Sequence, residues 1–401
     1  MANTLKFGNG QWATKEGSTL AYNDENGNFK PLPFDFTRAS SATRVNKDGL
    51  IETVGSNEPR IDFLNDSKGA LLLEPQRTNN LLQSNQFDTT WVTNTATIEG
   101  GQVGVGNTND AWLLSRTGTN GRIYQTSTSS GSQTLSVYAK SNTNNWLFLV
   151  IGSSETAYYD LENGVVGTTS SSNIAKIEPI GNNGWYRCSL TFTYTNPQVR
   201  IYPAFADNDV TGSGSIYIQN AQLEVGYATS YIPTQGSAVT RVADVCTNAG
   251  NNQVINSTEG VLYFQGSSIA NDGTFKRISV GTSDNLFENS IQLRYNAIDN
   301  SITYQFRVGN VYQADLTITT NTTNVNKIAC VWKINRFEIW VNGVKEAQDT
   351  SGSVPTLNTF DSLFFGKVSA SLTEPFYGNV KDLRVYNTAL TDAELQALTT
   401  L

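Results

Sequence analysis

The sequence predicts an all-β protein with two antiparallel β-sandwich domains of the jelly-roll type, preceded by a small β-rich N-terminal region. Only 15% of the 401 residues are charged, whereas 38% are hydrophobic. The chain contains 17 Tyr, 18 Phe and 7 Trp among many Asn, Thr, Ser and Gly residues, a composition typical of pleated strands with polar outer faces. Short alternating stretches are separated by Asn-Gly and Asp-Gly turns, which is the pattern of two packed sheets.

Residues 1–79 form the predicted N-terminal region, whose apolar pieces are short and separated by turn signals. Asp48-Gly49 lies between Arg44-Val45 and Leu50-Ile51. Because Gly adopts positive φ without steric cost, we expect a β-hairpin there.

Residues 80–245 form the predicted jelly roll, because polar and apolar residues alternate there with a period close to two. All residues of the segment 146–151 are large and apolar, which predicts a strand buried on both faces. In the segment 185–194, Cys188 falls on the apolar face, so we expect it to be a packed core thiol.

Residues 246–401 form the second predicted sandwich, after a polar segment at 239–256 that marks a boundary. One strand face is formed by apolar residues at every second position, namely Ile328, Cys330, Trp332 and Ile334. Near the end, Thr391 and Glu394 are spaced as a capping box, and Leu395 with Leu398 gives one apolar edge to a single closing helix.

Charge and missing residue types exclude several functions. With 27 Lys and Arg against 35 Asp and Glu, the net charge is -8, so we expect no nucleic-acid partner. There is no His, which excludes Ser-His-Asp and Cys-His catalysis and imidazole metal sites. The three Cys lie far apart, no apolar leader begins the chain, and no stretch approaches the roughly 20 apolar residues of a membrane span. We therefore expect reduced thiols, folding in a cytoplasm and no membrane insertion.

The N-terminal motifs resemble a signature of bacteriophage tail-fibre and head-fibre proteins, carried by residues 36–49, Pro59-Arg60-Ile61-Asp62-Phe63 and residues 71–79. In that family the signature precedes a carbohydrate-binding-module-like jelly roll. Similar marks follow here, namely Ser136-Val137-Tyr138-Ala139-Lys140, Gly184-Trp185-Tyr186-Arg187, residues 216–224, residues 229–234 and Thr240-Arg241-Val242-Ala243-Asp244.

The C-terminal region resembles a concanavalin-A-like lectin domain of the laminin-G type. The matching motifs are residues 337–344, 376–387 and Leu390-Thr391-Asp392-Ala393-Glu394-Leu395. The resemblances imply that both sandwiches are lectin-like.

Together the resemblances imply a structural virion protein, a head or tail fibre, which displays lectin-like domains for non-catalytic adhesion to host surface polysaccharide. They imply other virion structural proteins as partners, a homotrimer, and assembly in the bacterial cytoplasm into the virion. We expect residues 1–79 to attach the chain to the particle. Two alternatives stay open: a purely structural capsid or tail decoration protein, and a polysaccharide depolymerase.

Sugar recognition needs flat aromatic faces next to hydrogen-bonding groups. The candidate carbohydrate-binding residues are Trp91, Trp112, Trp146, Tyr158 and Tyr159 in the jelly roll, and Trp340 in the C-terminal domain. The alternative for each ring is packing in the core, and for Trp340 also contact with another subunit.

We expect no catalytic residue. Concanavalin-like glucanases supply their carboxylates from Glu-x-Asp-x-x-Glu, and no Glu of this chain has Asp two residues later. We predict no cofactor and no metal ligand. Calcium stays open, because Asp207, Asp209 and Asp299 carry suitable oxygen atoms but are also ordinary turn residues.

Three arginines of the N-terminal region, Arg38, Arg44 and Arg60, are candidates for binding an anion. We expect them instead to pair with acids such as Asp35, Asp48 and Asp62, or to contact another virion protein.

Overall fold

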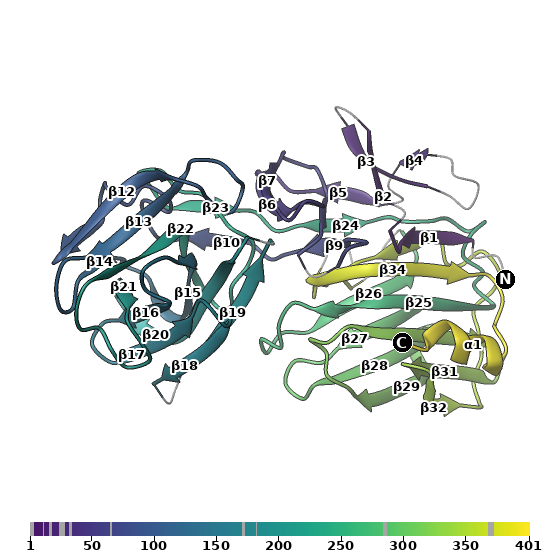
Figure 1. Cartoon of the computed structure of the whole chain (residues 1–401). Helices are drawn as coiled ribbons and strands as arrows, with labels where there is room; N and C mark the ends of the chain where they lie inside the picture. The colour runs from purple at the N-terminus through teal and green to yellow at the C-terminus, as the bar shows by residue number, and fades with distance from the viewer. Residues whose placement is uncertain are drawn as a thin grey trace. The chain divides into compact units, whose positions relative to one another are not determined.

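The computed structural model describes residues 4–10, 34–64, 66–170, 173–181, 183–283, 287–367 and 373–401, together with the backbone of 12–15, 18–23 and 29–31. Within these residues the chain forms antiparallel sheets and one short helix (Figure 1), so the predicted all-β fold is confirmed. The chain separates into two compact units. Unit 1 comprises residues 1–39, 55–75 and 243–401, and unit 2 comprises residues 40–54 and 76–242.

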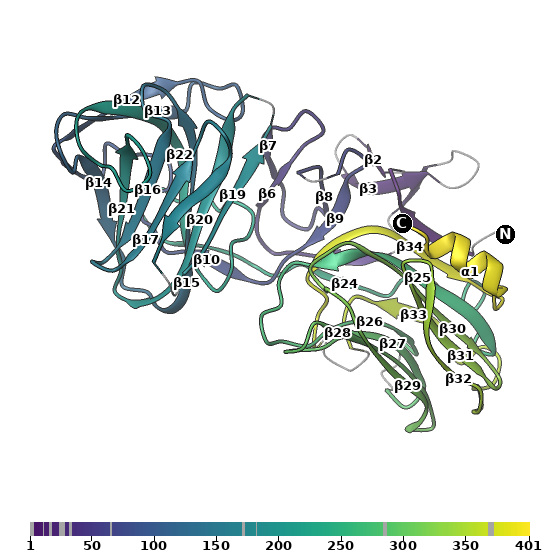
Figure 2. The same cartoon turned by 60° about the horizontal axis from the view of Figure 1, so that its bottom comes forward.

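Unit 1 contains two large sheets, which Figure 2 shows as two layers. The first has the order β32 (Val344–Asp349), β31 (Arg336–Val341), β30 (Asn326–Lys333), β25 (Glu259–Ser268), β34 (Gly378–Tyr386), β9 (Ala70–Leu73) and β8 (Arg60–Asp62), with β1 (Leu5–Gly8) also paired to β34. The second has the order β29 (Val311–Thr319), β28 (Ser301–Val308), β27 (Ser290–Tyr295), β26 (Lys276–Gly281) and β33 (Ser362–Phe364). Their facing side chains form one core that includes Phe264, Ile278 and Trp332.

Smaller sheets complete unit 1. They are the pair β5 (Asp35–Thr37) and β24 (Val245–Thr247), and the set β2 (Trp12–Lys15), β3 (Ser18–Asn23) and β4 (Phe29–Pro31).

The helix α1 (Asp392–Thr399) packs on the outer face of the larger sheet. Its predicted capping box is confirmed, because the Thr391 hydroxyl accepts from the Glu394 backbone N–H while the Glu394 carboxylate accepts from the Thr391 backbone N–H. Leu395 is fully buried and Leu398 partly buried, in a small cluster that also contains Val331 and Trp340.

Unit 2 is a sandwich of two six-stranded sheets. One has the order β12 (Ala96–Gln102), β13 (Ala111–Arg116), β22 (Gly214–Val225), β15 (Ser130–Ser141), β20 (Trp185–Thr195) and β19 (Ile174–Ile180). The other has the order β11 (Val92–Asn94), β14 (Arg122–Thr126), β21 (Gln198–Ala204), β16 (Trp146–Ile151), β17 (Glu155–Asp160) and β18 (Val165–Thr169). Two further pairs belong to this unit, β6 (Ala42–Val45) with β7 (Ile51–Val54), and β10 (Arg77–Asn79) with β23 (Val239–Arg241).

Most of the predicted strand faces are confirmed. The hairpin turn between β6 and β7 contains Gly49 at a φ of 78°, and Cys188 is buried in the core of unit 2. Two expectations were wrong. Ile334 lies in the turn after β30 and is 59% exposed, and β16 has only one face in the core.

The arginines of the N-terminal region do pair with acids, but with other acids than expected. Arg60 Nη1 lies 2.7 Å from Glu74 Oε2 and its Nη2 lies 2.5 Å from Asp244 Oδ2, while Arg38 Nη1 lies 3.0 Å from Asp244 Oδ1. All four side chains are buried. Arg44 instead forms an ion pair with Glu52 near the surface of unit 2.

Candidate functional site

The outer face of the sheet β11-β14-β21-β16-β17-β18 carries several aromatic rings on neighbouring strands. Strand β16 explains how this arises, because successive side chains of a strand point to opposite faces. Leu147 and Leu149 are buried in the core of unit 2, whereas Trp146 and Phe148 lie half-buried on the other face. We call Trp146, Phe148, Tyr158, Tyr202 and Tyr124 the aromatic surface. Tyr158 and Tyr202 are buried beneath their neighbours, whereas Trp146, Phe148 and Tyr124 are half-buried and present most of the accessible ring area.

Phe148 is the centre of the aromatic surface. In the strand register it lies directly opposite Tyr158 on β17 and Tyr202 on β21. The Phe148 and Tyr158 rings are stacked, with centroids 3.9 Å apart and planes at 14°, and the Tyr202 centroid lies 5.3 Å away. The Arg122 guanidinium lies 5.5 Å from the Tyr202 centroid and 6.0 Å from that of Tyr124, so cation–π attraction extends the row to β14.

The Trp146 ring lies against Gly167, where the lack of a side chain leaves room for it. Between the pairs Ala157–Thr169 and Tyr159–Val166, strand β18 has an additional residue, which is a β-bulge containing Gly167. A Cβ atom on Gly167 would lie 2.6 Å from Trp146 Cζ3 and 2.8 Å from Asp207 Oδ1. The indole ring and the carboxylate therefore meet at this glycine.

Hydrogen bonds fix the polar groups beside Trp146. Asp207 accepts from the Thr168 backbone N–H and hydroxyl, both at 2.9 Å. The Asn208 amide donates to the same hydroxyl at 2.8 Å. Burial, followed by the charges of Asp207 and Asp209, raises the pKa of Tyr158 to about 12, so its phenol stays protonated at neutral pH. The arrangement combines aromatic surface with hydrogen-bonding groups, as sugar recognition requires.

The structure places only two of the six predicted site residues, Trp146 and Tyr158, on the aromatic surface. Trp91 lies in the core of unit 2, where its indole N–H donates to the Gln83 carbonyl at 2.8 Å. Tyr159 is fully buried, and its hydroxyl donates to the Ser189 carbonyl at 2.7 Å.

The other two lie elsewhere. Trp112 belongs to the opposite sheet and is half-buried, with its indole N–H donating to the Asn85 carbonyl at 2.7 Å. Trp340 is buried in unit 1, and its indole N–H donates to Glu338 Oε2 at 2.9 Å. Buried Trp91, Tyr159 and Trp340 therefore offer little ring surface to a ligand, and the same holds for Tyr158, which is 7% exposed.

Sequence reasoning missed Phe148, Tyr202 and Tyr124. The signal for Phe148 was present, because it lies two residues after Trp146 on the same strand face. Tyr202 and Tyr124 carry no comparable signal, since only strand pairing brings them next to Phe148.

The outer face of the five-stranded sheet of unit 1 is polar instead. Arg277 is buried there, and its guanidinium bonds to Glu374, Gln292 and Gln305. Burial lowers the pKa of Arg277 although the hydrogen bond and charge of Glu374 oppose this. Because these polar groups bond to one another, the face is less suited to a ligand than the aromatic surface.

The described part of the chain lacks two features. No group of three or more His, Cys, Asp and Glu residues in it could hold a metal ion. None of its helices has the length and apolar character needed to cross a membrane.

Comparison with known proteins identifies part of unit 1. Residues 262–396 match the concanavalin A-like lectin/glucanases superfamily. The match begins in β25 and ends in α1, so it covers most of the two large sheets described above. This confirms the lectin-like fold expected for the C-terminal region. No curated protein matches the chain.

Several solved structures are weakly similar to this chain. The CBM40 of Ruminococcus gnavus IT-sialidase, bound to alpha2,3 sialyllactose, is 16% identical with a TM-score of 0.33, over 38% of this chain and 93% of its own. A heptameric SAP-like pentraxin from Limulus polyphemus is 13% identical with a TM-score of 0.32, over 37% and 72%. The NanB sialidase from Streptococcus pneumoniae, as a K499G mutant, is 11% identical with a TM-score of 0.33, over 37% and 25%.

Proposed function

We propose that this protein binds carbohydrate without catalysis, and that the aromatic surface of unit 2 contacts the sugar. The observation that carries the proposal is the meeting of Trp146 and Asp207 at Gly167. A pyranose has an apolar C–H face, which packs on an indole, and hydroxyl groups at its edge, which need acceptors and donors. Asp207, Asn208 and Thr168 supply both beside the same ring.

Two acids near this surface, Asp160 and Asp209, are unsuited to the proton-donor role in glycoside hydrolysis. Glycoside hydrolysis needs a carboxylic acid whose raised pKa keeps it protonated as a proton donor. Hydrogen bonds from Thr211 instead lower the pKa of Asp209, and hydrogen bonds from Asn163 and Glu162 lower that of Asp160 although its partial burial opposes this. Both groups are therefore ionised at neutral pH and cannot act as the acid.

We further propose that the protein is a fibre of a bacteriophage head or tail, present as a homotrimer that adheres to host surface polysaccharide. The N-terminal signature supports this role. Several copies on one particle would engage together, so modest single-site affinities would suffice. Gold-labelled antibody on intact particles tests the location, and light scattering of the purified chain tests the trimer. Label absent from particles would contradict the virion role.

The binding proposal predicts that Trp146→Ala weakens capture of host polysaccharide in a pull-down, because the sugar loses its apolar platform on unit 2. Phe275→Ala is the matched control, since Phe275 is an aromatic side chain of unit 1 that is 43% exposed. Equal capture by both variants would contradict the proposal. Particles that carry Trp146→Ala and infect normally would favour the decoration role.

A further inference from the structure

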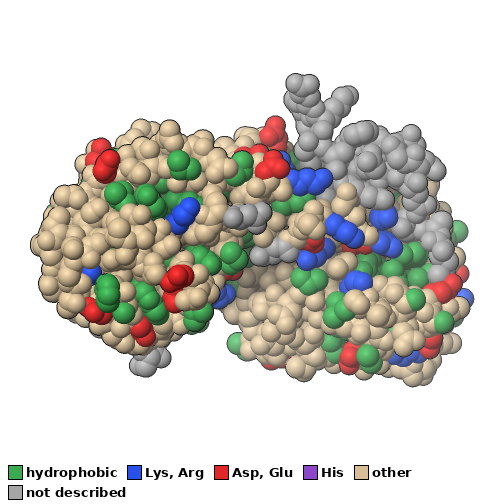
Figure 3. Space-filling view, viewed as in Figure 1, with side chains coloured by type: hydrophobic (Ala, Val, Ile, Leu, Met, Phe, Trp, Pro, Cys, Tyr) green, Lys and Arg blue, Asp and Glu red, His purple; other side chains and the backbone are tan. Residues whose placement is uncertain are grey.

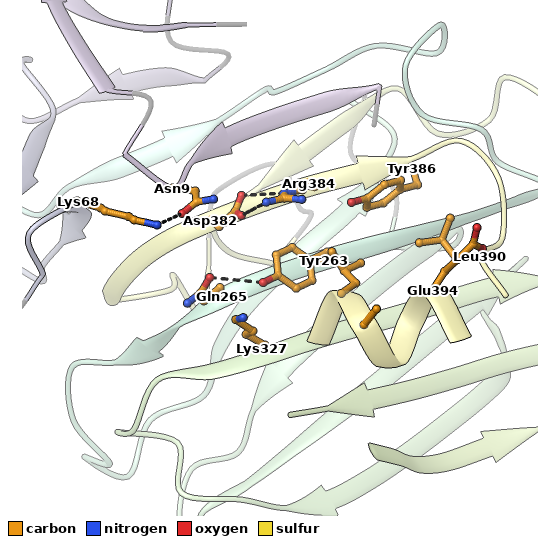
Figure 4. A pocket seen from close by; sticks show the side chains of 12 residues that line it. Asn9, Lys68, Tyr263, Gln265, Lys327, Asp382, Arg384, Tyr386, Leu390 and Glu394 are labelled. Atoms are coloured by element: carbon orange, nitrogen blue, oxygen red, sulfur yellow. Dashed lines mark hydrogen bonds and ion pairs between the residues drawn. The ribbon is translucent and has the colours of Figure 1, made fainter. Parts of the chain in front are cut away.

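A groove of about 640 Å³ lies on the outer face of the larger sheet of unit 1, beside α1 (Figure 4). This volume is within the range of about 300–1,000 Å³ typical of small-molecule sites. Neighbouring strands form its floor. Asp382 of β34 is in register with Gln265 of β25, which is in register with Lys327 of β30, and Arg384 is in register with Tyr263. The remaining lining residues are Asn9, Lys68, Tyr386, Leu390, Glu394, Ala397 and Leu398.

The charges of Asp382 and Arg384 cancel within the groove. Arg384 Nη2 lies 2.5 Å and its Nε 3.0 Å from Asp382 Oδ2. Burial raises the pKa of Asp382 although Arg384 opposes this. For Arg384, burial opposes ionisation, but the hydrogen bond and charge of Asp382 prevail and raise its pKa. This pair therefore forms part of the floor and adds no net charge to the groove, whose net charge comes from the other lining residues.

Two lysines provide that net charge. Lys327 Nζ donates to the Thr400 carbonyl at 2.6 Å, and Lys68 Nζ donates to Asn9 Oδ1 at 3.2 Å. Both acceptors are neutral, and in the described residues neither lysine forms an ion pair. Since an ammonium group has three donors, each lysine retains donors for a ligand. Figure 3 shows several basic side chains gathered along the same part of unit 1.

The other lining groups indicate what kind of anion fits. Glu394 accepts from Thr391 in the cap of α1 and keeps its negative charge. Lys68, Lys327 and Arg384 against Asp382 and Glu394 therefore leave the lining with a net charge of +1. The buried Tyr263 hydroxyl donates to Gln265 Oε1 at 3.4 Å, which leaves the Gln265 amide N–H groups to a ligand, and Leu398 gives the helix side of the groove an apolar edge. A bare inorganic anion would use the lysines alone, whereas a sugar has hydroxyl groups and an apolar face as well.

We propose that this groove binds a carboxylate-bearing sugar unit of an acidic polysaccharide, with Lys327 and Lys68 holding the carboxylate. The site lies in unit 1, and its existence does not rest on the aromatic surface of unit 2. Because the whole chain carries a net charge of -8, general attraction would not bring a polyanion to it, and the proposed binding depends on the local positive charge of the groove.

The test is calorimetric titration of the full chain with oligogalacturonate and with its methyl ester, which keeps the sugar but removes the charge. We expect the acid to bind and the ester to bind at least about tenfold more weakly. Lys327→Gln and Lys68→Gln should each weaken binding of the acid by about tenfold or more, because each removes a charged hydrogen bond. Lys68 is exposed, so its variant is expected to fold normally.

Lys333→Gln is the matched control. It removes one positive charge from the same strand, outside the groove, where Lys333 pairs with Glu259 at 3.2 Å. Trp146→Ala should leave binding of the acid unchanged, which separates this site from the proposed function. The proposal is overturned if the wild type does not bind oligogalacturonate, if Lys333→Gln weakens binding as much as Lys327→Gln, or if sulfate binds as tightly as the sugar.

Discussion

At the residue scale, Gly167 decides where the Trp146 ring and the Asp207 carboxylate lie. A methyl group at this position would come within 2.6 Å of the ring, so we expect Gly167→Ala to displace the ring and weaken sugar binding by about tenfold. The half-buried ring can move outward, so the thermal midpoint should change little. Gly106→Ala is the control, since its Cβ would meet only the Thr108 hydroxyl at 3.4 Å. Unchanged affinity in Gly167→Ala would show that the ring position does not matter.

The buried ion pairs of unit 1 give a second prediction at the residue scale. Arg60→Met leaves the charges of Glu74 and Asp244 buried with less compensation, and should lower the free energy of unfolding by about 3–5 kcal/mol. Arg44→Met removes a pair whose side chains are 17% and 37% exposed, so it should cost at most about 1 kcal/mol. Urea unfolding of the two variants checks this. Equal losses of unfolding free energy in the two variants would contradict the larger contribution expected from the buried Arg60 network.

At the scale of elements, the sequence predicts which residues form strands better than it predicts which strands pair with one another. The alternation of residues 185–194 predicts β20 and the burial of Cys188, because side-chain direction in a strand depends only on position. Alternation also continues through Ile334, where the strand has already ended at a turn with Asn335 at a φ of 56°. Pattern alone therefore does not mark the end of a strand.

Strand order is the part that the sequence does not reveal. β16 pairs with β21, some fifty residues later in the chain, and only this pairing places Tyr202 beside Phe148. The same holds for Asp244, which pairs with Arg60 although 184 positions separate them in the sequence. The fold class and single site residues such as Trp146 were predictable, whereas the aromatic surface as an assembly was not.

At the scale of the whole molecule, the division into two units can be tested through the three thiols. All are buried, and burial raises the pKa of each, so we expect slow alkylation of the native protein. In increasing urea, Cys246 and Cys330 of unit 1 should become reactive together, and Cys188 of unit 2 separately. Peptide mapping after pulse alkylation measures this. If Cys246 became reactive at the same urea concentration as Cys188, and not with Cys330, the division into these two units would be contradicted.

The raised pKa values of the three thiols also determine how the stability of the fold changes with pH. The folded chain keeps its thiols protonated, whereas the unfolded chain loses those protons above a pH of about 8.5. Stability is therefore fully present below that pH and decreases as the pH rises further. The urea midpoint should be lower at pH 10 than at pH 7, and an equal or higher midpoint would show that these thiols are not buried.

The central claim is that sugar contacts Trp146, and indole N–H signals of the protein with ¹⁵N-labelled tryptophan test it most directly. The chain has 7 Trp, and Trp146→Phe identifies the signal that belongs to Trp146. On addition of oligosaccharides from the host surface, the account predicts that this signal moves while those of buried Trp91 and Trp340 stay. Movement of the other signals with that of Trp146 unchanged would contradict it.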